Sequence, residues 1–239
     1  MKHKIRLFII VLFIWQLIAM IVNKDVIIPY PLDVFLRMIT MLQDLSFYQT
    51  IFITLSHVCI VVLMSAIVAF FLAYTGYHYP IVDEYVSPLL SVLQAIPNIS
   101  FIILVLVWTE SLQTVYIVLT LVIFPLLYHN LIQGFRGIDQ DLEDVIILYH
   151  PPFRYKFLNV YFPLVKRSFL SGLKSSLSLG VKVAVMAEIL AQLPQGVGRA
   201  INYCRIQFDM TGVFAWTVWL LILILWIELL LERFISERR

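Results

Sequence analysis

The sequence has few charged residues for its length. Of its 239 residues, 13% are charged and 62% are hydrophobic, whereas a soluble domain averages roughly 25% and 45–50%. A chain of this size has too little interior to hide so much apolar surface from water. The composition argues against a soluble enzyme, a nucleic-acid-binding protein and a disordered chain. It predicts an all-α polytopic membrane protein.

Cysteines and catalytic motifs are also scarce. Cys59 and Cys204 are far apart in the chain and match neither a disulfide framework nor a zinc-ligand spacing. The sequence contains no HExxH, GxSxG or GxxxxGK[ST] pattern. We therefore expect no catalytic residue, metal or cofactor in this chain. If the protein uses nucleotide energy, another chain must bind the nucleotide.

Long apolar runs make up most of the sequence. A helix needs about 20 apolar residues to cross a bilayer. Six segments meet this requirement: 5–22, 51–74, 89–108, 115–131, 169–190 and 213–231. Pro97 breaks the third segment, and Pro125 lies inside the fourth. Basic residues precede the first segment, but no small-x-small cleavage pattern follows it, so we interpret it as an uncleaved helix rather than a signal peptide.

The lysines and arginines predict how these six spans are oriented. If the N-terminus is cytoplasmic, eleven of the 17 basic residues fall inside, four fall outside and two, Lys174 and Lys182, lie in the fifth span. Cytoplasmic loops of membrane proteins carry such an excess. We therefore expect both termini in the cytoplasm. The predicted cytoplasmic loop between the second and third spans contains Asp83 and Glu84 but no Lys or Arg. The orientation still holds, because acidic residues contribute little to the charge rule.

A polar segment separates the fourth and fifth spans on the predicted cytoplasmic side. Acids at its start complement a helix dipole, and Asp139 or Asp141 can cap the first turn. An apolar stripe follows at helical spacing: Leu142, Val145, Ile146 and Tyr149. The pattern predicts a short amphipathic helix that starts near Asp141 and ends at Pro151-Pro152. Its stripe packs either on the membrane domain of the same chain or on a partner chain.

This segment resembles a cytoplasmic motif of the binding-protein-dependent permeases, the membrane subunits of type I ABC importers. The motif reads Glu-Ala-Ala, three residues, Gly, nine residues, Ile, one residue, Leu-Pro. This chain fills the positions with Asp144-Val145-Ile146, His150, Val160, Phe162 and Pro163. The acid is retained as Asp and the proline is identical, whereas His150 replaces the glycine.

Other segments resemble the nitrate, sulfonate and taurine branch of that family. They are Pro29-Tyr30-Pro31, the stretch from Pro88 to Pro97, Phe124-Pro125, and Ala187-Glu188 followed by Gly196-Val197-Gly198. In order and spacing the resemblance extends from about Pro29 to Glu232.

The resemblance implies a type I ABC importer permease fold formed by residues 1–239 as one domain. It implies a coupling segment at 139–166 that transmits the movement of an ATPase subunit. The coupling residues would be Leu142, Glu143, Asp144, Val145, Ile146, Tyr149, His150 and Pro163. The implied partners are two ATPase subunits that bind ATP and Mg²⁺, a second permease copy in a homodimer, and an extracytoplasmic binding protein. The implied location is the plasma membrane of a bacterium.

The fifth span is the candidate for the solute pathway. It has small residues at four-residue steps, which let membrane helices approach closely, and it contains charges that are costly in a bilayer. We expect its pathway or gate residues to be Ser176, Gly180, Lys182, Ala184 and Glu188. For Lys182 and Glu188 a structural hydrogen bond is the alternative. Because six residues separate them, they lie on different faces and form no direct ion pair.

Two other classes of protein fit a polytopic chain. An ion-coupled secondary transporter predicts inverted repeats and acid pairs near the middle of the membrane, and the sequence shows neither. An intramembrane enzyme needs a clustered nucleophile and base or clustered metal ligands. The five histidines are scattered along the chain, so we favour the importer permease.

Overall fold

The computed structural model describes residues 2–149 and 151–236, and every regular element in this part of the chain is a helix. In chain order they are α1 (Lys2–Val22), α2 (Pro31–Met41), α3 (Leu45–His78), α4 (Pro80–Ala95), α5 (Asn98–Leu106), α6 (Ser111–Arg136), α7 (Gln140–Tyr149), α8 (Phe153–Tyr155), the π-helix η1 (Lys156–Tyr161), α9 (Phe162–Leu190), α10 (Val197–Ile206) and α11 (Met210–Ser236). The expected all-α class is confirmed.

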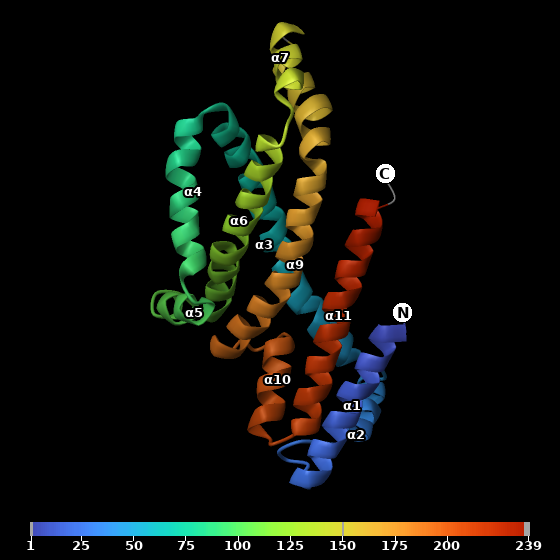
Figure 1. Ribbon diagram of the computed structural model, residues 1–239. Coiled ribbons are helices and arrows are strands. Elements are labelled where there is room, and N and C mark those ends of the chain that lie inside the picture. Colours follow the sequence, from blue (N-terminus) through green and yellow to red (C-terminus); the bar gives the residue numbers. More distant parts are fainter. Residues whose placement is uncertain (1, 150, 237–239) are drawn as a thin grey trace.

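Three long helices, α3, α6 and α9, pack together at the centre of the molecule (Figure 1). Their contact faces carry fully buried aliphatic side chains such as Val58, Ile123 and Val181. Gly180 lets α9 approach closely, because a Cβ there would lie 2.9 Å from Val58 Cγ1 and 3.1 Å from Ile123 Cδ1. The predicted stripe of small residues therefore packs α9 against helices of its own chain.

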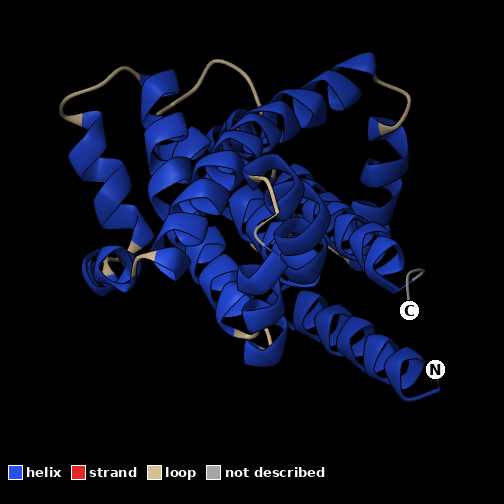
Figure 2. Cartoon of the chain, turned by 90° about the horizontal axis from the view of Figure 1, so that it is seen from above, coloured by secondary structure: helices blue, strands red, loops and turns tan. Residues whose placement is uncertain are grey.

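The remaining helices surround this centre. Helix α11 packs against α2, α9 and α10, and α1 packs against α2. Trp15 of α1 stacks on Phe214 of α11 with ring centroids 5.5 Å apart. Viewed from above, α1 lies at the edge of the molecule (Figure 2). The outer surfaces of α1, α3 and α11 expose many large apolar side chains, Leu63, Ile67 and Leu229 among them, as lipid-facing helices do.

The third predicted span is bent sharply. Residues 89–108 do not form one straight helix, because α4 ends at Ala95 and α5 begins at Asn98 with a 91° change of direction. Pro97 has no N–H and disfavours the helical conformation of the residue before it. Ile96 is accordingly extended, with φ −77° and ψ 130°.

Three helices, α3, α6 and α11, are long and apolar enough to cross a membrane, and the bent pair α4–α5 makes a fourth if it is one span. Helix α1 contains a shorter apolar stretch, Ile9–Val22. Helix α9 is 29 residues long and carries Lys174, Lys182 and Glu188 among its apolar residues. The length and composition of the helices thus support three to four spans directly, fewer than the six predicted.

Candidate functional site: the projecting helix α7 and the polar contacts of α9

Helix α7 stands at one end of the molecule, beyond the end of α6 and opposite α2 and α10 (Figure 1). Asp139 starts it. The Asp139 carboxylate accepts a hydrogen bond from the Asp141 N–H at 3.2 Å, and its carbonyl accepts one from the Glu143 N–H at 3.2 Å. Acids in the first turn add to this cap through the helix dipole. The helix begins one residue before the predicted start at Asp141.

Ile146 and Glu143 of α7 contact the rest of the chain. Ile146 is buried, and the Tyr161 hydroxyl donates a 2.8 Å hydrogen bond to Glu143 Oε1. Tyr161 is itself fully buried against aromatic side chains that include Tyr74 and Phe135. Burial raises the pKa of Tyr161, and the bond to Glu143 raises it further. The tyrosine therefore stays a neutral donor that links α7 to η1.

The other face of α7 is exposed. Leu148 is 76% exposed and Tyr149 is 79% exposed, and Leu142, Asp144 and Val145 are exposed as well. Three of the four residues in the predicted apolar stripe thus point away from this chain, and only Ile146 turns inward. His150 lies outside the described residues. An uncovered apolar face bordered by acids is typical of a surface that binds a partner.

The segment after α7 leads directly into α9. Helix α8, η1 and α9 follow one another without a break from Phe153 to Leu190. Pro163 lies at the junction of η1 and α9, where it removes one backbone hydrogen-bond donor from the continuous helix. A displacement at the end near α7 can therefore pass along α9.

A second polar group near this end was missed from the sequence. Asp83 was assigned to a loop, but it lies in the first turn of α4 and is buried. It accepts a 2.6 Å hydrogen bond from the Tyr128 hydroxyl and forms an ion pair with Arg136. Tyr128 and Arg136 are eight residues apart on α6, so only packing of α4 on α6 brings the three together.

Glu188 lies at the other end of α9 and is fully buried. Its carboxylate accepts hydrogen bonds from Thr54 Oγ1 at 2.9 and 3.0 Å and from the Gly198 N–H at 2.8 Å, and His57 Nδ1 lies 3.3 Å away. Thr54 also accepts from the Val197 N–H at 2.8 Å. The carboxylate thus joins α3, α9 and the N-terminus of α10, where a negative charge is favoured.

Two polar contacts join α9 to α11. Lys174 pairs with Glu232, and Ser178 Oγ donates a 2.6 Å hydrogen bond to Glu228 Oε1. In each helix the two residues are one turn apart, and the helices run in opposite directions, so the contacts form successive rungs. No local pattern singled out Glu228 or Glu232, because their partners are 50 and 58 residues away in the chain.

The structure separates the five predicted pathway residues. Ser176, Gly180, Ala184 and Glu188 are buried within the chain, whereas Lys182 is exposed. Lys182 and Glu188 are on different faces, as expected. In this conformation the small residues contact α3 and α6 rather than an open route, so their role as gate residues stays a prediction.

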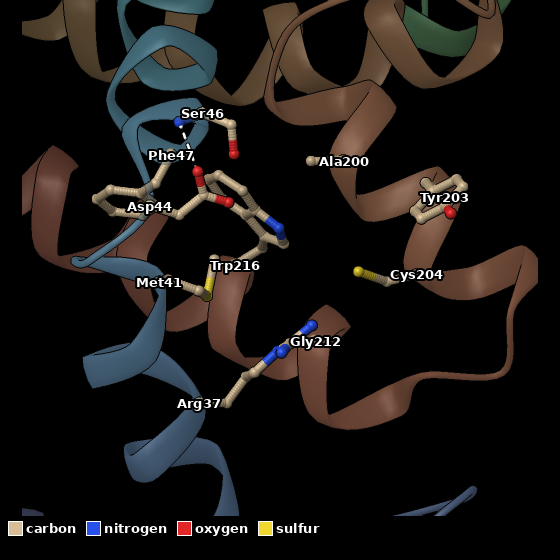
Figure 3. Close-up of a pocket in the computed structure, with 10 residues that line it drawn as sticks. All are labelled: Arg37, Met41, Asp44, Ser46, Phe47, Ala200, Tyr203, Cys204, Gly212 and Trp216. Carbon is tan, nitrogen blue, oxygen red and sulfur yellow. Dashed lines mark hydrogen bonds between the residues drawn. The ribbon is translucent and has the colours of Figure 1, made fainter.

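A pocket of about 190 Å³ lies where α2, α10, α11 and the start of α3 meet (Figure 3). Arg37, Tyr203 and Cys204 line it together with Phe47 and Trp216. Hydrogen bonds from Ser46 lower the pKa of the nearby Asp44 carboxyl. Two hollows of about 490 and 330 Å³ adjoin this pocket and share Tyr203 with it. They lie at the end of the molecule opposite α7 (Figure 1).

These features describe a helical protein with long apolar helices and, at one end, a short helix with an exposed apolar face. The family of binding-protein-dependent transport system inner membrane components matches residues 65–238. This match covers most of the chain, so the chain belongs to that family. It is a membrane-embedded permease subunit of an ABC importer and not an enzyme. The family implies an ATPase and a binding protein as partners.

Individual relatives agree with this assignment. The chain is 26% identical over 210 residues to the formylaminopyrimidine transport permease protein ThiX of Halalkalibacterium halodurans, covering 87% of this chain and 83% of that protein. It is 27% identical over 218 residues to a putative ABC transporter permease of Methanocaldococcus jannaschii, covering 89% and 81%. It is 23% identical over 210 residues to the putative aliphatic sulfonates transport permease protein SsuC of Bacillus subtilis, covering 86% and 75%.

Proposed function

We propose that this permease couples ATP hydrolysis to solute import through α7, which docks into a cleft of an ATPase subunit. The observation that carries the proposal is the uncovered apolar face of α7, which is followed in the chain by the continuous helix of α8, η1 and α9. Leu142, Asp144, Val145 and Tyr149 are exposed and would contact the ATPase. Glu143 and Ile146 hold α7 on the membrane domain.

The coupling segment extends over residues 139–166 within a single permease domain, 1–239. Pro163 lies at the start of α9 and would shape the connection between the docking face and the pathway helix. His150 lies outside the described residues and stays a candidate coupling residue. When two ATPase subunits close on ATP, they push this segment and switch the membrane domain between outward and inward access. Such a movement has to bias an equilibrium between two states.

The assembly we propose contains two copies of this chain, two ATPase subunits that bind ATP and Mg²⁺, and an extracytoplasmic binding protein. The six spans would be α1, α3, the bent pair α4–α5, α6, α9 and α11, with both termini in the cytoplasm of a bacterium. The excess of Lys and Arg on the side of α7 supports this orientation. The length of α9, 29 residues, supports counting it as a span.

The solute is a small molecule that the binding protein delivers. Two relatives are named for formylaminopyrimidine and aliphatic sulfonate transport, and this chain would carry a solute of comparable size. Ser176, Gly180, Ala184 and Glu188 would act in the gate by changing how α9 packs on α3 and α6. Lys182 would face the route itself.

Co-purification tests the docking role of α7. We expect Val145→Glu and Tyr149→Ala each to reduce the ATPase recovered with a tagged permease about tenfold, which corresponds to about 1.4 kcal/mol of binding free energy. Tyr85→Ala is the matched control, because Tyr85 is 76% exposed but lies on α4. If the α7 variants retain the ATPase as well as Tyr85→Ala does, the docking assignment is wrong.

A further inference from the structure

Tyr161 of η1 contacts three other helices at the end of the molecule that carries α7. Its hydroxyl donates a 2.8 Å hydrogen bond to Glu143 Oε1 of α7. The centroid of its ring lies 5.2 Å from that of His78 and 5.5 Å from that of Tyr74, both in α3, and 6.2 Å from that of Phe135 in α6. The side chain is fully buried. A single residue of η1 therefore joins α7 to both of the long helices on which α9 packs.

The π-helical geometry of η1 orients this tyrosine. Lys156 lies five residues before Tyr161, and its ammonium nitrogen is 5.2 Å from the centroid of the tyrosine ring. In an α-helix, residues five apart are separated by about 140° around the axis, whereas the i→i+5 hydrogen bonds of a π-helix bring such residues closer to one side. π-Helical turns are rare and occur frequently at functional sites. The register of η1 thus turns the ring toward α3 and α6 while the hydroxyl reaches α7.

A second aromatic residue fixes η1 to α3. The ring centroid of Phe157 lies 5.2 Å from that of Phe70 and 5.7 Å from that of Phe71, on which it stacks. The contacts of Tyr74 and His78 with η1 extend this attachment along about two turns of α3. Protein interiors packed in this way have low compressibility and pass a displacement on to their neighbours. We therefore expect η1 and this end of α3 to move together.

The other route for a displacement of α7 is the backbone that leads through α8 and η1 into α9. Helix α9 fits closely against α3 and α6, because a Cβ at Gly180 would lie 2.9 Å from Val58 Cγ1 and 3.1 Å from Ile123 Cδ1. A movement that reached α9 alone would have to disrupt this packing. A movement that reaches α3 and α6 at the same time leaves the packing intact.

We propose that Tyr161 transmits the movement of α7 to α3 and α6, so that closure of the ATPase moves these two helices together with α9. The inference rests on the proposed function, since it requires an ATPase subunit to act on α7. It goes further by adding a positioning residue outside the docking face. Tyr161 is buried within the chain and acts through Glu143, not through contact with the ATPase or the solute.

Amide hydrogen exchange follows this movement without knowledge of the solute. The permease is purified with its ATPase subunits, and exchange is measured without nucleotide and after trapping with ATP and vanadate. The windows are residues 74–83, at the end of α3 and the start of α4, and residues 131–138, at the end of α6. Each variant is compared with itself in the two nucleotide states, so a uniform change in stability is subtracted.

We expect Tyr161→Phe to reduce the nucleotide-dependent difference in both windows about twofold or more, because the ring stays packed while its hydrogen bond to a carboxylate is lost. Glu143→Ala should have the same effect, and the double variant should show no further loss, since both changes remove one contact. Glu143→Gln should keep the native difference, because its amide oxygen still accepts from the tyrosine hydroxyl. Tyr85→Phe is the matched control, since Tyr85 is 76% exposed on α4.

Two results would overturn the inference. One is native protein whose exchange in both windows does not respond to nucleotide, because α3 and α6 then do not move when the ATPase closes. The other is a Tyr161→Phe protein that responds as the native protein does. Glu143→Ala provides the decisive variant if Tyr161→Phe does not assemble.

Failure of this inference can be told apart from failure of the proposed function. Tyr161→Phe leaves the exposed face of α7 unchanged, so the variant should retain its ATPase on co-purification. The proposed function is tested by loss of the ATPase from Val145→Glu. An assembly that keeps its ATPase, but in which Tyr161→Phe leaves the exchange response unchanged, refutes only the role of Tyr161.

Discussion

Glu188 shows at the residue scale why a glycine pair follows an acid in this sequence. Gly196 has φ +102°, a conformation that favours glycine, and a Cβ there would lie 2.6 Å from Glu188 Oε2. At Gly198 a Cβ would lie 2.4 Å from Glu188 Cβ. The backbone of α10 can therefore reach the buried carboxylate only where side chains are absent.

Thr54→Val should destabilise the protein by about 1.5–3 kcal/mol, because it removes a donor to a buried carboxylate. It also leaves the Val197 N–H without its acceptor. Thermal unfolding in detergent measures the loss. Thr120→Val is the control, since Thr120 is exposed and donates only to Tyr116 O in its own helix. Equal unfolding temperatures for the two variants would show that the Glu188 contacts contribute little.

Gly180→Ala should destabilise the core by about 1–3 kcal/mol, because overpacking forces neighbouring side chains to move. The added Cβ would meet Val58 and Ile123 at 2.9 and 3.1 Å. Gly137→Ala is a suitable control, since its nearest neighbour would be Gln133 O at an ordinary 3.5 Å. Thermal unfolding of both variants decides the point, and a Gly180→Ala protein as stable as the control contradicts the close packing.

At the scale of elements, the stability of α7 depends on its N-cap and on one hydrogen bond to η1 more than on the length of the helix. It has ten residues, and isolated helices this short are marginal in water. Asp139 fixes its start, and the Tyr161–Glu143 bond fixes its position against η1. These contacts hold the helix in place while its apolar face stays exposed.

Asp139→Ala should weaken α7 by about 1 kcal/mol through loss of the N-cap. We expect faster amide hydrogen exchange over residues 140–149 and weaker coupling of ATP hydrolysis to transport. Asp139→Asn is the control, because asparagine caps a helix as well as aspartate does. Unchanged exchange in the alanine variant would mean that the cap does not hold α7.

At the scale of the whole molecule, α7 lies at one end (Figure 1) and the three hollows lined by residues of α2, α10 and the start of α3 lie at the other. Helix α9 runs between these ends and is held to α11 by the Lys174–Glu232 and Ser178–Glu228 contacts. Its movement is therefore tied to that of α11. This arrangement agrees with the proposed function, in which coupling and solute entry are on opposite sides of the membrane.

If this orientation is right, reporters at both termini will face the cytoplasm. A fluorescent protein fused to either end should fold and fluoresce in bacterial cells, whereas alkaline phosphatase at the same positions should be inactive. A phosphatase inserted after Gln207, in the turn after α10, should be active. Activity at either terminus would contradict the six-span topology with both ends inside.

Periodicity and capping rules were enough to predict α7, its acidic start and its apolar stripe, but not whether the stripe is exposed. They could not show that Ile146 turns inward, because the stripe is continuous in sequence. They also placed Asp83 in a loop, since the Tyr128 and Arg136 that bind it lie about 50 residues later on α6. The sharp bend at Pro97 was expected as a break, but its angle depends on packing.

The sequence by itself determined the membrane class, the all-helical fold and the short amphipathic segment, because these follow from composition and local spacing. Only the tertiary structure decided which polar residues find partners. Among the described residues, Glu188, Glu228 and Glu232 find partners on other helices. Charges in a membrane helix look alike in sequence, and what distinguishes them is whether a distant helix brings a complementary group within hydrogen-bonding distance.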